Sequence, residues 1–218
     1  MVRNAWNVNE AGQSPARVWS WAASAPEVAE RREHVEGLVG KRITLVRYVT
    51  LDYRREEFRP ELIDSGVRFI EDARELERPT WTCPGFDAVD FGVELETIDA
   101  EIWSLTWDPP GEHEGIGLRK GPLFGSFADG LTAVWEATRS SLWSPIVGSP
   151  IAAVELHYTP WDPPSPGFWC PRISLITHDA RLEVVMGGND HGRLVASANN
   201  IAILAPETPL PPWPYLAD

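Results

Sequence analysis

Apolar and polar residues alternate along several short stretches of the chain, the pattern of strands with one buried face. The clearest stretch is 90–96, where three apolar residues alternate with Asp90, Glu94 and Glu96. Strict alternation places these three carboxylates on one face of a strand and the apolar residues on the other. β-Branched, aromatic and other apolar residues predict further strands at 43–51, 115–119, 151–158 and 200–204.

Two helices are predicted, each directly before one of the long strands. Residues 26–38 begin with a proline and acidic residues and end near glycines, which are helix start and stop signals. In residues 129–142, Leu131, Val134, Trp135 and Leu142 stand at helical spacing. The sequence therefore predicts one helix directly before each of the two long strands, 43–51 and 151–158.

The same pattern occurs twice along the chain. Segment 38–46 matches segment 146–154, which lies 108 residues later, and 93–102 matches 173–182, which lies 80 residues later. The second match keeps a Thr-x-Asp-Ala core. Two matches in the same order predict duplication of one helix–strand–hairpin–strand unit. A feature found in only one copy is then the better candidate for function.

These elements predict an α+β fold with mostly antiparallel sheet and pseudo-two-fold symmetry. We expect one domain over 1–218, because neither repeat, at about 26–120 and 129–205, has an obvious way to bury its sheet face alone. The first repeat holds a charged insert at about 54–78 with six arginines and eight acidic residues. It is interpreted as a solvated surface excursion or as an element that contacts a partner. A proline-rich tail, 206–218, is expected to be extended.

Composition narrows the class of protein. Hydrophobic residues make up 43% of the 218 residues and charged residues 23%, as in ordinary globular proteins. The chain has no apolar run of about 18 residues and no apolar signal segment after Met1, so a cytoplasmic protein without a membrane partner is expected. Two cysteines are too few for a disulfide framework, and both Cys83 and Cys170 are expected to be small buried apolar groups.

Negative charge is concentrated in one part of the chain. Residues 1–79 carry 14 acidic and 13 basic residues, whereas 80–218 carry 18 acidic and 6 basic residues. Within 87–114 there are nine acidic residues and no Lys or Arg. Such a surface would repel nucleic acid, which is bound through cations. It would attract a basic protein, or it would serve solubility alone.

Candidate catalytic chemistry is weak. The five histidines form no standard metal motif, and the sequence has no nucleophile elbow, no P-loop and no dinucleotide-binding glycine motif. The best local cluster is Glu112-His113-Glu114, on which an uncharacterised hydrolase-type enzyme could be built. No metal, no cofactor and no catalytic residue is predicted.

Eleven tryptophans are the remaining unusual feature. Most are expected in the core, but Trp also dominates binding surfaces. The leading hypothesis is a non-enzymatic cytoplasmic protein, of the kind bacterial immunity or inhibitor proteins exemplify, that binds a basic partner. Its predicted contact residues are Asp90, Glu94 and Glu96, with Trp103 and Trp107 as anchors. The alternative is a small-molecule or carbohydrate-binding β-rich domain with a pocket lined by Trp107, Trp161 and Trp169. The oligomeric state is left open.

Overall fold

The fold is that of a computed structural model, which describes residues 21–51, 81–108, 115–123, 132–161, 167–197 and 200–210. These residues form mostly antiparallel sheet with one short helix. The predicted predominance of antiparallel sheet is confirmed, and the helical content is smaller than an α+β reading implies. The predicted insert at 54–78 and the tail beyond residue 210 lie outside the described residues.

One sheet contains most of the second half of the chain and ends in two strands from the first half. Every neighbouring pair in it is antiparallel, and a short strand, β1 (Trp21–Ala22), pairs with the beginning of its longest strand. In spatial order the sheet consists of β9 (Ala153–Trp161), β10 (Gly167–Ile176), β11 (Arg181–Met186), β14 (Ile201–Leu204), β4 (Phe86–Val89) and β3 (Thr82–Cys83).

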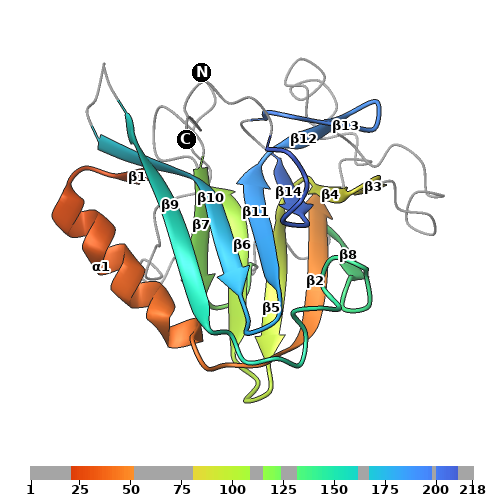
Figure 1. Ribbon diagram of the computed structural model, residues 1–218, viewed down its shortest axis with the longest axis horizontal. Helices are drawn as coiled ribbons and strands as arrows, with labels where there is room; N and C mark the ends of the chain where they lie inside the picture. Colours follow the sequence, from red (N-terminus) through yellow and green to blue (C-terminus); the bar gives the residue numbers. More distant parts are fainter. Residues whose placement is uncertain are drawn as a thin grey trace.

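A five-stranded antiparallel sheet contains most of the first half. Its order is β7 (Gly115–Lys120), β6 (Ile102–Asp108), β5 (Gly92–Thr97), β2 (Ile43–Leu51) and β8 (Thr132–Glu136). A separate two-stranded ribbon is made by β12 (Gly188–Asp190) and β13 (Arg193–Val195). In Figure 1 the sheet with β9, β10 and β11 lies in front of the five-stranded sheet, with helix α1 (Ala25–Val35) beside β9.

The main hydrophobic cluster fills the space between the two sheets. It draws residues from both halves of the chain, because inward-facing positions alternate with outward-facing ones along each strand. From the five-stranded sheet come Val46, Val93, Leu95, Leu105, Ile116 and Leu118, and from the other sheet come Leu156, Ile173, Leu175, Leu182, Val184, Ile201 and Ile203.

The first predicted helix is present. Ser24 caps α1, accepting a hydrogen bond from the backbone amide of Glu27 at its side-chain oxygen over 3.4 Å, and a proline stands in the first turn. A 3-10 turn, η2 (Glu36–Leu38), continues it to the predicted end. Val28, Val35 and Leu38 are its buried residues. None of the described helices is long and apolar enough to cross a lipid bilayer.

The second predicted helix, at 129–142, is wrong. Residues 132–136 form the edge strand β8, and turns follow. The register places Trp135 opposite Tyr48 and Val134 opposite Val49, so β8 extends the five-stranded sheet. The apolar residues happen to fit helical spacing, but pairing with β2 satisfies the backbone of this segment and leaves Val134 on the surface.

Four strands follow the same spatial order in both sheets. The order β2-β5-β6-β7 in one corresponds to β9-β10-β11-β14 in the other. Where the halves meet, the Gly40 amide donates to the Ile151 carbonyl and the Gly148 amide donates to the Ile43 carbonyl, each over 2.8 Å. Both glycines have φ of +82°, a conformation that side-chain-bearing residues rarely adopt. The matched segments therefore bind each other reciprocally.

Candidate functional site

The predicted acidic face lies on β5, and much of it is buried. Val93 and Leu95 point into the main cluster, so Glu94 and Glu96 point to the outer side of the sheet, as the alternation predicts. Glu94 is only 7% exposed and accepts a hydrogen bond from the Leu123 amide over 2.8 Å. Asp90 is 5% exposed. Of the three predicted carboxylates, Glu96 is the most accessible.

Arg47 on β2 balances part of this charge. Its Nη2 donates to Glu96 Oε2 over 2.6 Å, and its Nη1 lies 3.6 Å from Glu94 Oε2. Two carboxylates that share one guanidinium leave a single net negative charge at this place. The outer side of β5 is thus an ion-paired surface with a partly buried carboxylate.

The tip of the β5–β6 hairpin has a different character. Ile98 is 69% exposed there, more than any other large hydrophobic residue among those described. Beside it, Lys41 forms ion pairs with Asp99 and with Glu101, whose Oε2 lies 3.2 Å from the ammonium. Lys120 pairs with Glu101 from the other side. The tip is an apolar side chain flanked by ion pairs.

The predicted tryptophan sites lie mainly inside the protein. Trp103 and Trp169 are 2% and 1% exposed and belong to the main cluster. Trp107 is half-buried, and its indole Nε1 donates to the Asp90 carbonyl over 2.6 Å. The Trp161 backbone belongs to β9, and its side chain lies outside the described residues. The structure therefore does not gather these tryptophans at one described surface.

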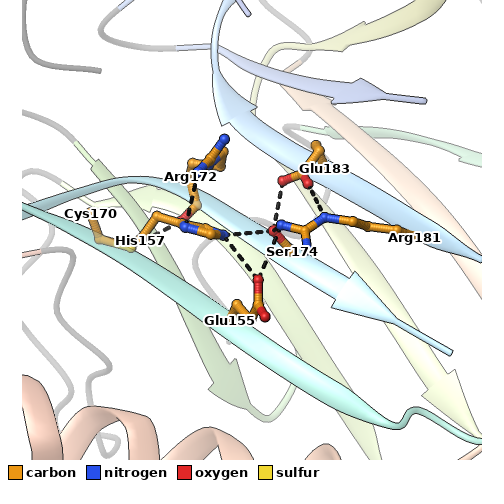
Figure 2. Close-up of polar contacts among 7 residues, drawn as sticks. All are labelled: Glu155, His157, Cys170, Arg172, Ser174, Arg181 and Glu183. Carbon is orange, nitrogen blue, oxygen red and sulfur yellow. Dashed lines mark hydrogen bonds and ion pairs between the residues drawn. The ribbon is translucent and has the colours of Figure 1, made fainter. Parts of the chain in front are cut away.

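A polar network that the sequence did not single out lies on the outer side of β9, β10 and β11 (Figure 2). The network has six side chains, two from each strand. Alternation along the strand places each pair on this face, and cross-strand pairing aligns the pairs. The members are Glu155 and His157 on β9, Arg172 and Ser174 on β10, and Arg181 and Glu183 on β11.

His157 is the centre of the network, and Figure 2 shows it between Arg172 and Ser174. Arg172 Nη2 lies 3.0 Å from His157 Nδ1, and His157 Nε2 lies 2.7 Å from Ser174 Oγ. A guanidinium can only donate, so Nδ1 accepts and the ring proton sits on Nε2. His157 therefore donates to Ser174.

The hydroxyl of Ser174 is then fully used. It donates to Glu183 Oε2 over 2.7 Å and accepts from Arg181 Nη2 over 2.8 Å, in addition to accepting from His157. A Ser-His catalytic pair needs the opposite arrangement, with the imidazole accepting the serine proton and an acid on the other ring nitrogen. The serine is also buried. This network is arranged as a structural polar cluster rather than as a nucleophile and its base.

Electrostatics agrees with a neutral imidazole. Burial lowers the pKa of His157 below its usual 6.5, and the charge of Arg172 lowers it further. The carboxylates of Glu155 and Glu183 oppose this shift. At neutral pH the ring therefore carries one proton.

A second buried polar group lies between the sheets. Tyr48 on β2 donates its hydroxyl proton to Asp87 Oδ2 on β4 over 2.7 Å, and Trp143 Nε1 donates to the same hydroxyl over 2.7 Å. Burial raises the pKa of Asp87 to about 6, although hydrogen bonds from Tyr48 and Thr82 oppose the shift. Asp87 is one of the nine acidic residues of 87–114, but it faces the core and adds nothing to an external acidic surface.

Metal and thiol chemistry find no support in the described part of the chain. No group of three or more His, Cys, Asp or Glu side chains is placed there to hold a metal ion. The cluster at 112–114 lies outside the described residues. Cys170 is fully buried, and burial raises the pKa of its thiol to about 12. Cys83 is half-buried.

Comparison of the chain with protein-family models, with curated proteins and with solved structures gives no match. The site must therefore be judged on its own geometry. The sequence does contain a sign of the network on β9, β10 and β11, because polar residues stand two positions apart in each of these three strands. The sequence does not reveal the register that brings these positions together.

Proposed function

We propose that the protein is a non-enzymatic binding protein that recognises a basic protein partner. The charge of the chain supports the sign of the partner, because residues 80–218 carry 12 of the 13 net negative charges. A net field of this size increases the rate at which an oppositely charged protein is encountered. The proton arrangement around Ser174, in which His157 donates, supports a role other than acyl transfer.

The observation that carries the proposal is the tip of the β5–β6 hairpin. In protein interfaces a few side chains contribute most of the binding energy, and apolar contacts of this kind are surrounded by a polar rim. Ile98 supplies the apolar contact, and Asp99 and Glu101 supply carboxylates that can exchange their present lysine partners for those of a basic protein. Glu96 extends the same surface along β5.

The other residues predicted from the sequence lie behind the hairpin and hold its structure. Glu94 fixes the Leu123 amide, and Trp103 fills the core beneath the same hairpin, on β6. Trp107 binds the backbone at Asp90. In this proposal they hold the hairpin rather than touch the partner. A ligand pocket lined by tryptophans has less support, because Trp169 is almost completely buried.

The test is capture of partners from a lysate of the source cells, with matched variants of two exposed side chains. Ile98→Ala removes the proposed contact, and Val134→Ala removes a comparable exposed side chain on β8, which is 50% exposed. We expect a basic protein to be retained by the wild type and by Val134→Ala and to be lost with Ile98→Ala. Equal retention by both variants would remove the hairpin tip from the proposal.

Charge is tested with a second matched pair. Asp99→Lys reverses a carboxylate at the hairpin tip, and Asp190→Lys reverses an exposed carboxylate on the β12–β13 ribbon. We expect Asp99→Lys to slow association by about tenfold or more at low salt, and Asp190→Lys to have a smaller effect. The association rate constant, measured at several salt concentrations, is the readout. A rate independent of salt in the wild type would contradict a basic partner.

We also propose that the two halves of the chain descend from one duplicated unit. The common strand order and the reciprocal hydrogen bonds of Gly40 and Gly148 support this. The repeated Thr-x-Asp-Ala turns support it too, since Thr97 and Thr177 each accept a backbone hydrogen bond from within their turn. Superposition tests it: a single rotation should place β2, β5, β6 and β7 on β9, β10, β11 and β14.

A further inference from the structure

Arg172 forms no direct ion pair with any described residue. Its guanidinium donates to His157 Nδ1 over 3.0 Å, and its Nε is buried without a hydrogen-bond partner among the described residues. Within the same part of the chain no carboxylate comes within 4.0 Å of it. A buried N–H group without a hydrogen-bond partner is unfavourable. The position is therefore suited to an anion.

Two other arginines on the outer sides of the sheets are paired. Arg47 binds Glu94 and Glu96, and Arg181 binds Glu155 and Glu183. Arg172 lies two residues along β10 from Ser174, which stands opposite Glu155 and Glu183. Its own neighbour on β9 is the neutral imidazole of His157 instead of an acid. Arg172 thus differs from both, because no carboxylate of the described strands lies within ion-pair distance of it.

The corresponding place in the five-stranded sheet is closed by the chain itself. There the cross-strand pair is Val49 and Gly92, where the other sheet has His157 and Arg172. Leu123 and Phe91 cover it, and a Cβ at Gly92 would come within 2.9 Å of a Leu123 methyl group. The fold can therefore cover this position with apolar residues. In the second half it places a cation there instead.

We propose that the outer side of β9 and β10 binds a small oxyanion, a carboxylate or a tetrahedral anion, between Arg172 and His157. Guanidinium matches the oxygen atoms of such groups in charge and geometry. This inference is independent of the proposed protein partner, because it concerns the other sheet and a ligand of opposite charge.

Binding of the anion is coupled to one proton. His157 Nδ1 now accepts from Arg172, and an oxyanion at that nitrogen requires a hydrogen there. The ring therefore takes one proton from solvent on Nδ1 and keeps the proton on Nε2 that Ser174 accepts. The released guanidinium and the imidazolium both donate to the anion.

The charged groups that face the ring set the size of this coupling. Glu155 Oε2 lies 3.6 Å from Nε2, and Glu183 is linked through Ser174. Both favour the imidazolium, whereas Arg172, Arg181 and burial disfavour it. The Cys170 thiol is fully buried and stays protonated. An added anion tips this balance toward protonation.

The test uses sulfate as the probe, because its charge is constant between pH 5 and 8. NMR of the full chain follows the Arg172 Nε–H and the His157 ring during a sulfate titration, so that no variant is needed. We expect saturable shifts at both residues and a rise in the pKa of His157. Absence of shifts at millimolar sulfate would overturn the proposal.

Variants then locate the site. We expect Arg172→Gln to weaken sulfate binding by about tenfold or more, since a charged hydrogen bond is lost. Arg193→Gln, on the exposed side of β13, is the matched control and should bind as the wild type does. Equal binding by Arg172→Gln and the wild type would overturn the assignment. A Tm for each variant establishes that it is folded.

The dependence on pH separates this site from unspecific attraction. The affinity of the wild type for sulfate should fall as pH rises above the pKa of the free ring, approaching tenfold for each pH unit. His157→Gln should bind with little dependence on pH. Acetate compared with sulfate identifies the geometry that is preferred. An affinity that depends on pH equally in His157→Gln and the wild type would contradict the coupling.

Discussion

Tyr48 donates a hydrogen bond to Asp87 across the space between the two sheets, over 2.7 Å. This contact joins β2 to β4 and puts a carboxylate among apolar side chains. Burial also raises the pKa of Tyr48, and the nearby Asp87 charge adds to that shift, so the phenol remains a donor throughout the ordinary pH range. A hydrogen-bonded carboxyl in the core gives the protein a stability that depends on pH.

We expect Asp87→Asn to raise the free energy of unfolding at pH 7 by about 1–3 kcal/mol. The pKa of Asp87 rises from the usual 3.8 to about 6 in the folded protein. Its stabilising contribution is complete below about pH 3.8 and is lost as the pH rises through 6. The amide of the variant would keep an acceptor for Tyr48 without this loss. Urea unfolding at pH 4.5 and 7.5 measures the difference, and an equal dependence on pH in both proteins would contradict the assignment.

Ser174 should not behave as an enzymatic nucleophile. Because His157 Nε2 donates to it, we expect no labelling of Ser174 by a fluorophosphonate. Ser174→Ala should lower the free energy of unfolding by about 1–3 kcal/mol, because Glu183 and Arg181 lose a buried partner. Ser144→Ala, in an exposed turn, is the control and should change it by about 0.5 kcal/mol or less. Labelling of Ser174 would contradict a proton on His157 Nε2.

Replacing glycines by alanine should lower the stability of the protein by different amounts at different positions. Gly40→Ala and Gly148→Ala should each cost about 1 kcal/mol, since φ is +82° at both positions while an added Cβ meets no atom within 4 Å. Gly92→Ala should cost more, because its Cβ would lie 2.5 Å from the Leu105 carbonyl oxygen. Chemical denaturation of the three variants gives the order. A larger loss for Gly40→Ala than for Gly92→Ala would contradict it.

The two thiols should differ in reactivity. Cys170 is fully buried and burial raises the pKa of its thiol to about 12, whereas Cys83 is half-buried. In native protein, we expect one cysteine, Cys83, to react with a thiol reagent well before the other. Mass spectrometry of the modified peptides identifies it. Equal rates would show that the region around Cys170 opens as readily as that around Cys83.

Short-range patterns predicted much of the fold. The strand at 43–51 matches β2, and the helix from 26 to 38 matches α1 followed by η2. Both rest on local signals, namely β-branched residues and a capped, proline-started turn. The error at 129–142 shows the limit of such signals. There the free edge of β2 decides the structure, and that edge lies more than eighty residues away in the sequence.

The candidate site could be predicted only in part for the same reason. Alternation placed Glu94 and Glu96 on the outer side of β5 correctly. It could not reveal that Leu123 returns to cover Glu94, or that Arg47 lies between the two carboxylates. The contact between His157 and Arg172 depends on strand register, which alternation leaves undetermined.

The reciprocal hydrogen bonds at Gly40 and Gly148 also have a consequence for how the chain folds. At this junction Arg42 donates to the Gly148 carbonyl, 106 residues further along the chain. The entropy of closing so long a loop must be offset before the contact stabilises anything, whereas the β5–β6 and β10–β11 hairpins close only short loops. During synthesis on the ribosome, the start of β2 in the five-stranded sheet therefore lacks these hydrogen bonds until residues 148–151 have emerged.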